Sequence, residues 1–171
     1  MPQSRLFSDA SFSDCRTFRY ALRRRWGVGA PAAFIGLNPS TADDTHDDPT
    51  IRRCVDFARR WGFGGLTMVN LFAFRATDPW MLGEEQAKNG EVVGADNDGY
   101  LLAHAKEAGI VVAAWGAWRG VGVRADAVRA LCEQHGVSLY ALGMTRGGHP
   151  RHPLYLRADT RPLLWPYGAT Q

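Results

Sequence analysis

The chain has 171 residues, with 20 basic and 17 acidic side chains, so its formal net charge is +3. Hydrophobic residues make up 46% of it and charged residues 22%, a composition that is typical of a globular protein and excludes an intrinsically disordered chain. The length fits one domain, and we expect a single domain over residues 1–171.

Short apolar runs predict the strands of a sheet. They cover residues 32–37, 66–72, 110–115 and 138–143. Ahead of them, residues 15–26 alternate aromatic and basic side chains, a pattern that fits either an edge strand or a short helix.

Helical patterns separate these runs. The first predicted helix has Asp48 at its N-cap and Pro49 at its first position, and it ends before Gly62. Two more helices are predicted over about 95–108 and 124–135. The alternation is typical of βαβ units and predicts an α/β fold with three layers, α/β/α, around a central four-stranded parallel sheet.

The first apolar run ends in the sequence GLNPSTAD. Ligands of parallel α/β sheets bind outside the carboxyl ends of the strands, so Asn38 is a candidate site residue there. The alternative is a plain turn in which Asn38 caps its own backbone. The acidic stretch 43–48, which contains His46, has no metal-ligand spacing; helix capping and solvation explain it, and no metal is expected.

The second run ends in the sequence NLFAFRATDP. A planar ring could stack on Phe72 or Phe74 while Asn70 reads its edge. The alternative is that both phenylalanines belong to the core and that Asn70 satisfies backbone groups.

The fourth run leads into a loop that contains His149-Pro150 and His152-Pro153 among glycines and arginines. Such a loop suits phosphate contacts, and a histidine in it can donate a hydrogen bond to developing negative charge. The alternative is a surface loop with two exposed histidines.

Together these motifs resemble the uracil-DNA glycosylase superfamily, which has a strand-end motif of the type G-x-N-P-G and a late H-P-S motif. GLNPS and HPLYLR stand at the corresponding places of this chain. Ser40 replaces the usual second glycine, Leu154 replaces the serine, and the cysteines of the branch with an iron–sulfur cluster are missing. The combination GLNPSTAD, DDPTIRRC, NLFAFRATDP and GHPRHPLYL also resembles a bacterial family of domains of unknown function over about residues 18–165.

The superfamily resemblance implies roles for particular residues. Asn38 would position the water that attacks C1′ of a flipped nucleotide, and His152 would stabilise the departing base. Asp43, or in its place Asp48, would activate that water. Asn70 would read the base, with Phe72 or Phe74 as the stacking partner. Phosphate contacts would come from Ser40, Arg75, Arg146, His149, Arg151 and Arg157.

The function that this resemblance implies is a DNA glycosylase that hydrolyses the N-glycosidic bond of a damaged or modified base, with DNA as the partner and without a cofactor. Two alternatives stay open: a non-catalytic protein that binds nucleic acid or modified bases, and an enzyme that acts on free nucleotides. Three cysteines without a C-x-x-C pair, no signal peptide and no long apolar run favour a cytoplasmic protein unattached to membranes. We expect a monomer.

Overall fold

A computed structural model describes residues 6–165, and within them the chain forms one seven-stranded sheet, four α-helices and a 3-10 helix. In chain order the elements are β1 (Phe7–Phe12), β2 (Arg19–Arg25), β3 (Ala32–Gly36), α1 (Pro49–Arg60), β4 (Gly65–Asn70), α2 (Pro79–Asn89), α3 (Asn97–Glu107), β5 (Ile110–Ala113), α4 (Gly122–Gln134), β6 (Tyr140–Ala141), η1 (Pro153–Tyr155) and β7 (Leu163–Leu164).

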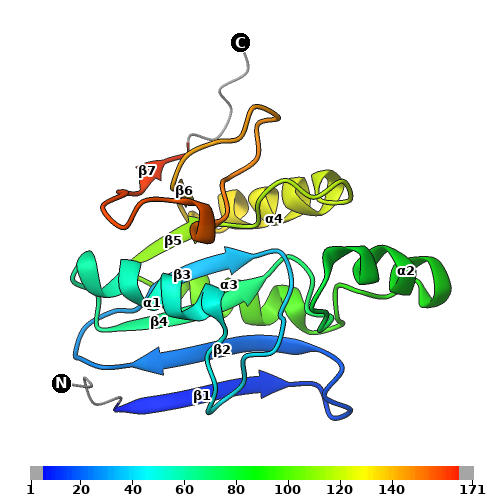
Figure 1. The fold of residues 1–171 in the computed structure, drawn as a ribbon, viewed down its shortest axis with the longest axis horizontal. Coiled ribbons are helices and arrows are strands. Elements are labelled where there is room, and N and C mark those ends of the chain that lie inside the picture. The colour runs from blue at the N-terminus through cyan, green and yellow to red at the C-terminus, as the bar shows by residue number, and fades with distance from the viewer. Residues whose placement is uncertain (1–5, 166–171) are drawn as a thin grey trace.

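The strands lie in the order β1-β2-β4-β3-β5-β6-β7 (Figure 1). The four strands predicted from apolar runs are β3, β4, β5 and β6, and they pair in parallel at the centre of the sheet. Antiparallel strands extend this centre on both sides, β2 and β1 beyond β4 and β7 beyond β6. The predicted central parallel sheet is therefore confirmed, but it is part of a larger mixed sheet.

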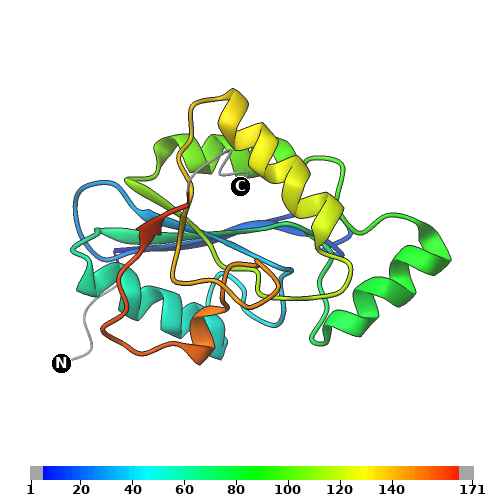
Figure 2. The same cartoon turned by 90° about the horizontal axis from the view of Figure 1, so that it is seen from above.

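The helices cover both faces of the sheet, as the predicted three layers require (Figure 2). Side chains alternate along β3: Phe34 packs with α1 on one face, and Ile35 packs with α3 and α4 on the other. α2 lies to one side of these layers (Figure 1). Since both faces are covered, the central strands are buried and read as apolar runs.

Helix α1 begins as the sequence predicts. Asp48 is its N-cap, and the carboxylate accepts a hydrogen bond of 2.9 Å from the backbone N–H of Ile51; Pro49 follows at the first helical position. This capping fixes the side chain of Asp48 at the end of the helix that lies nearest the carboxyl ends of the strands.

The segment 15–26 contains a strand, β2, but this strand does not lie at the edge. β1 pairs with its outer side, and β4 pairs with its inner side. The sequence analysis predicted neither β1, whose residues FSDASF mix polar and apolar types, nor α2, whose residues read as part of a loop. None of the helices in the described part of the chain could cross a membrane.

Candidate active site

A cavity of about 480 Å³ lies at the carboxyl ends of β3, β4 and β5. The loop after β3 leads to α1 on one face of the sheet, whereas the loop after β5 leads to α4 on the opposite face. The cavity therefore sits where the strand order reverses, the place at which open parallel sheets bind ligands. Its volume is within the range of small-molecule sites.

Five segments of the chain build the wall of this cavity. They are the end of β3 with the loop to Thr41, the first turn of α1, the loop 76–79, the loop 115–118 and the segment 152–155, together with Arg19 of β2 and Met68 and Asn70 of β4. Asn38, Ser40, Asn70 and His152 are among the predicted site residues that the fold brings together here.

Asn38 bridges two of these loops. Its Nδ2 donates hydrogen bonds of 3.0 Å to the carbonyl of Pro39 and 2.8 Å to the carbonyl of Ala76. Both partners are acceptors, so the orientation of the amide is determined, and Oδ1 is the atom left for a ligand or a water molecule. Asn38 thus makes the predicted local bond to the backbone, and it also lines the cavity.

Asp48 also lines the cavity. One carboxylate oxygen caps α1, and within the described residues the other oxygen, Oδ2, accepts no hydrogen bond. A carboxylate held by its helix, with one oxygen left over, can accept a proton from a water molecule.

His152 is the second histidine of the late loop, and it caps η1. Its Nδ1 accepts a hydrogen bond of 3.2 Å from the backbone N–H of Leu154, so in the neutral ring the proton resides on Nε2. Partial burial lowers the pKa of His152, and the carboxylate of Asp48 opposes this shift. At neutral pH the ring is therefore an uncharged donor in the cavity wall.

Helix α1 holds His152 in place through Arg53. The guanidinium of Arg53 donates to the carbonyls of Pro153 and Leu156, at the two ends of η1. The loop after β5 contributes as well, because the N–H of Gly116 donates to the carbonyl of Pro150 over 2.9 Å. The two loops that meet at His152 are thereby tied to the rest of the fold.

Asn70 ends β4 and is 1% exposed. Neither its Nδ2 nor its Oδ1 has a hydrogen-bond partner, although both are buried. Gly36 pairs with Asn70 across the sheet, and a Cβ atom there would lie 2.7 Å from Oδ1. Because Gly36 has no side chain, the Asn70 amide has room beside it at the cavity.

Unpartnered buried polar atoms concentrate at this cavity. Among the described residues there are seven such side-chain atoms, and four of them belong to Arg19, Asn70 and Trp115, all of which line the cavity. Native proteins satisfy most buried polar groups, because each orphan costs about 1–3 kcal/mol. A ligand that fills the cavity is the natural source of the missing partners.

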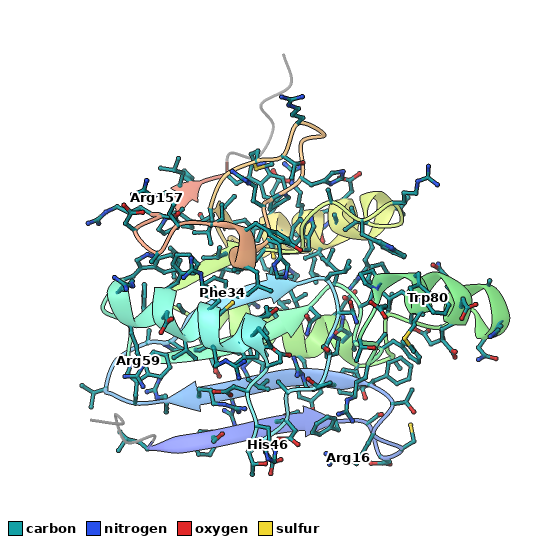
Figure 3. All side chains as sticks on the ribbon, in the orientation of Figure 1. Arg16, Phe34, His46, Arg59, Trp80 and Arg157 are labelled. Atoms are coloured by element: carbon teal, nitrogen blue, oxygen red, sulfur yellow. The ribbon has the colours of Figure 1, made fainter. Side chains whose placement is uncertain are left out.

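Asp43, the predicted water-activating residue, does not line the cavity. Its Oδ1 accepts hydrogen bonds from the backbone N–H groups of Thr45 and His46 and from the side chains of both. These bonds hold the pKa of Asp43 well below its usual range. The loop that contains it crosses the sheet toward β1, where His46 lies at the surface (Figure 3).

Phe72 and Phe74, the predicted stacking residues, also lie outside the cavity wall. Phe72 is 3% exposed in the core and packs edge-on against Trp118, and Phe74 packs against Phe18. This placement supports the alternative that both phenylalanines belong to the core. The aromatic side chains that do line the cavity are Trp115, Trp118 and Tyr155.

Of the predicted phosphate-binding residues, only Ser40 lines the cavity. Arg75 packs over the ring of Phe12 and donates to the carbonyl of Arg16. Arg157 lies beside β7 and pairs with Asp159 (Figure 3). The remaining three are on the loop before η1, where Arg146 and Arg151 are exposed and His149 is partly buried.

The sequence analysis missed Arg19, Trp115, Trp118 and Tyr155. Trp115 ends the third apolar run, so the rule that points to strand ends could have found it. Arg19 carries no such signal, because its segment was ambiguous between strand and helix. In the described range, histidine, cysteine, aspartate and glutamate side chains form no cluster of three or more that could hold a metal ion.

Fold and cavity together define an α/β protein with a candidate ligand site at the point where its strand order reverses. The model of one protein family, described as "Protein of unknown function (DUF1643)", matches residues 19–154. The chain belongs to this family, which confirms the predicted membership in a family of unknown function. Neither a curated protein nor a solved structure matches the chain, and nothing in these comparisons links it to the uracil-DNA glycosylase superfamily.

Proposed function

We propose that the cavity binds a single nucleobase and that the protein hydrolyses the N-glycosidic bond of a damaged or modified base in DNA. The observation that carries the proposal is Asn70, a fully buried amide with a donor and an acceptor that both lack partners. The resemblance of GLNPS and HPLYLR to glycosylase motifs agrees with it, because Asn38 and His152 of these motifs line the same cavity.

The edge of a base would supply what Asn70 lacks. Nucleobases present neighbouring donors and acceptors on their edges, and a side-chain amide can pair with two of them. Trp118 lines the cavity and is only partly buried, so its ring can offer apolar surface to a planar base. In this proposal Trp118 replaces Phe72 and Phe74 as the aromatic neighbour of the base.

Hydrolysis would use the other side chains of the wall. A water molecule held by Oδ1 of Asn38 attacks C1′ while Asp48 takes its proton. The bond between C1′ and the base nitrogen breaks, and the electron pair leaves with the base. Nε2–H of His152 donates to the oxygen on which negative charge develops, a role that a neutral ring with its proton on Nε2 fits.

A free nucleotide is the second candidate substrate, and Arg19 favours it. This buried cation lies in the wall of the cavity, so the cavity itself offers a counter-charge to an anionic group of the ligand. The exposed arginines Arg146 and Arg151 are outside the wall, where they suit a longer strand of DNA.

The test is a panel of labelled single- and double-stranded oligonucleotides that contain uracil, hypoxanthine, xanthine, 5-hydroxymethyluracil or a mismatch. Alkali after incubation reveals abasic sites. The key variant is Asp48→Asn, because asparagine keeps the N-cap of α1 but cannot accept the proton. We expect strand cleavage that falls about 10²- to 10⁴-fold in Asp48→Asn, the range for loss of a general base.

Three other outcomes have distinct meanings. Binding of an oligonucleotide without cleavage would overturn the enzymatic proposal in favour of a non-catalytic binder. Hydrolysis of nucleoside monophosphates, without any action on DNA, would establish the second candidate. Equal cleavage by the wild type and Asp48→Asn would remove Asp48 from the mechanism.

A further inference from the structure

Arg19 is a buried cation whose hydrogen-bonding capacity is mostly unused. The residue is 2% exposed, its Nη1 donates to the carbonyl of Ala42 over 2.7 Å, and its Nε has no partner. No carboxylate of the described residues forms an ion pair with it. Burial lowers the pKa of Arg19 to about 10, so the guanidinium stays charged at neutral pH.

A β-bulge turns Arg19 toward the cavity. Ser11 of β1 pairs with Ala21, but the next residue, Phe12, pairs with Arg19, so β2 has one extra residue, Tyr20, at this point. The ring of Tyr20 stacks on Tyr100 of α3, and Ala21 belongs to the core on the same face. Arg19 therefore faces the α1 side, where the carbonyl of Ala42 and the cavity lie.

Hydroxyl groups that could share an anion with Arg19 come from the loop after β3. Thr41 directly precedes Ala42, whose carbonyl holds the guanidinium, and Ser40 precedes Thr41. Both residues line the cavity, and in the described structure neither hydroxyl has a hydrogen-bond partner. Asp48 raises the pKa of Arg19 across the cavity but forms no ion pair with it, so the guanidinium is not neutralised.

We propose that Arg19, Ser40 and Thr41 form an anion subsite of the cavity that binds the phosphate group of a nucleotide ligand. Guanidinium groups bind phosphate oxygens through two parallel hydrogen bonds, and hydroxyl groups complete such sites. The subsite deepens the proposed function, on which it rests for the nucleotide nature of the ligand. It also explains why a charged side chain occupies a buried position without an ion-pair partner.

Inorganic phosphate is the first probe, because it tests the subsite without any assumption about the base or the reaction. Thermal unfolding is followed in phosphate and in chloride at matched ionic strength. The variants are Arg19→Met, Arg19→Lys and a control, Arg161→Met, which removes the same charge from an exposed residue outside the cavity. We expect phosphate to raise the unfolding midpoint of the wild type, of Arg161→Met and, in part, of Arg19→Lys.

The rise should vanish in Arg19→Met. An equal rise in the wild type and Arg19→Met, or no rise in the wild type, would overturn the subsite. If Arg19→Met does not fold, the double variant Ser40→Ala/Thr41→Ala makes the same test, because its residues lie in the loop and not in the core. A rise that is undiminished in this double variant would then count against the subsite.

Two further probes distinguish the source of the phosphate. Affinities of deoxyribonucleoside monophosphates, of the matching deoxyribonucleosides and of a single-stranded oligonucleotide are measured by calorimetry. A preference of at least tenfold for monophosphate over nucleoside that is lost in Arg19→Met assigns the subsite to a free nucleotide. If Arg19→Met lowers the affinity for the oligonucleotide but not for the monophosphate, the subsite is assigned to the DNA backbone.

The two proposals fail separately. Base excision from DNA with no phosphate effect at Arg19 would remove the subsite and leave the proposed function standing. A phosphate effect that depends on Arg19, in a protein that neither binds nor cleaves any nucleotide or oligonucleotide, would leave an anion site and remove the nucleotide ligand.

Discussion

Two buried arginines on β2 have opposite surroundings. Arg24 pairs with Asp47 over 2.9 Å and also donates to backbone carbonyls, among them that of Arg23 over 3.0 Å. We call these contacts the Arg24 network; its carbonyls belong to Asp9, Arg23, Asp43 and His46. Arg19, by contrast, has one carbonyl partner and an orphaned Nε in the cavity wall.

We infer from this difference that the same residue type has a structural role at Arg24 and a binding role at Arg19. The Arg24 network joins β2 to the loop 43–47 and satisfies a charge that lies out of reach of water. At the cavity, the polar atoms of Arg19, Asn70 and Trp115 are buried but unsatisfied. Satisfied buried groups such as Arg24 hold this fold together, and we propose that the concentration of unsatisfied ones at the cavity marks a place for a ligand.

The largest effect is expected at the Arg24 network. Arg24→Met removes the hydrogen bonds that Asp47 and several carbonyls accept from Arg24 inside the protein, so the free energy of unfolding should fall by about 3–5 kcal/mol. Urea unfolding of the variant measures this. A loss below about 1 kcal/mol would show that the Arg24 network contributes little to stability, and it would contradict the proposed contrast with Arg19.

The next effect concerns the catalytic role that we propose for His152. Asparagine at position 152 still accepts the N–H of Leu154, but the donor at Nε2 is gone, and we expect base excision to slow about 10²- to 10³-fold in His152→Asn. His149→Asn is the matched control, since His149 also precedes a proline in this loop but does not line the cavity. Equal losses in both variants would contradict the role of His152.

A smaller effect is expected where the cavity and the sheet meet. In Gly36→Ala the new methyl group would lie 2.6 Å from the end of Met68 and 2.7 Å from Oδ1 of Asn70, so both side chains must shift. Unfolding free energy should fall by about 1 kcal/mol, and ligand affinity should fall with it. Gly99→Ala, with open space around its Cβ position in α3, should instead be neutral or stabilising.

The smallest effect is a dependence on pH. Burial lowers the pKa of His152 and of His104, so below the ordinary histidine pKa of about 6.5 the unfolded chain takes up protons first. The contribution of these rings to stability is present above that pH and is lost as the pH falls toward their folded-state values. Unfolding curves at pH 7.5 and 5.5 should show this loss, and His152→Asn should reduce it. An unchanged loss in the variant would assign it to His104 alone.

The sequence was sufficient to predict the core of the fold and part of the cavity. Apolar runs predicted β3, β4, β5 and β6, and the rule that ligands bind at strand ends led to Asn38, Asn70 and His152. The capping of α1 by Asp48 followed from local chemistry alone. These features depend on periodicity and short-range hydrogen bonds, which a single sequence contains.

The remainder depends on contacts between distant segments. The bulge that turns Arg19 to the cavity arises from pairing with β1, a strand that its mixed residues do not reveal. Phe72 and Phe74 follow the end of β4, where alternation no longer fixes the direction of a side chain. Asp43 and Asp48 could be told apart only by the path of their loop across the sheet.

The central claim is that the unpartnered amide of Asn70 serves to bind a ligand. Asn70→Leu tests this claim most directly, because leucine has nearly the shape of asparagine but no polar side-chain atoms. Asn97→Leu is the matched control: Asn97 is equally buried and its Oδ1 also lacks a partner, but its Nδ2 donates to the carbonyls of Asn70 and Leu71. Free energies of unfolding are compared for both variants, together with the affinity for the nucleotide or oligonucleotide that the wild type binds.

We predict that the free energy of unfolding of Asn70→Leu is about 1–3 kcal/mol higher than that of the wild type, because the orphaned polar atoms of Asn70 lower stability. We also predict that the variant no longer binds the ligand, because these atoms serve only binding. Asn97→Leu should be less stable than the wild type by about 1–2 kcal/mol, because two buried carbonyls lose a donor. An Asn70→Leu variant that is less stable than the wild type, or that binds the ligand unchanged, would contradict the account.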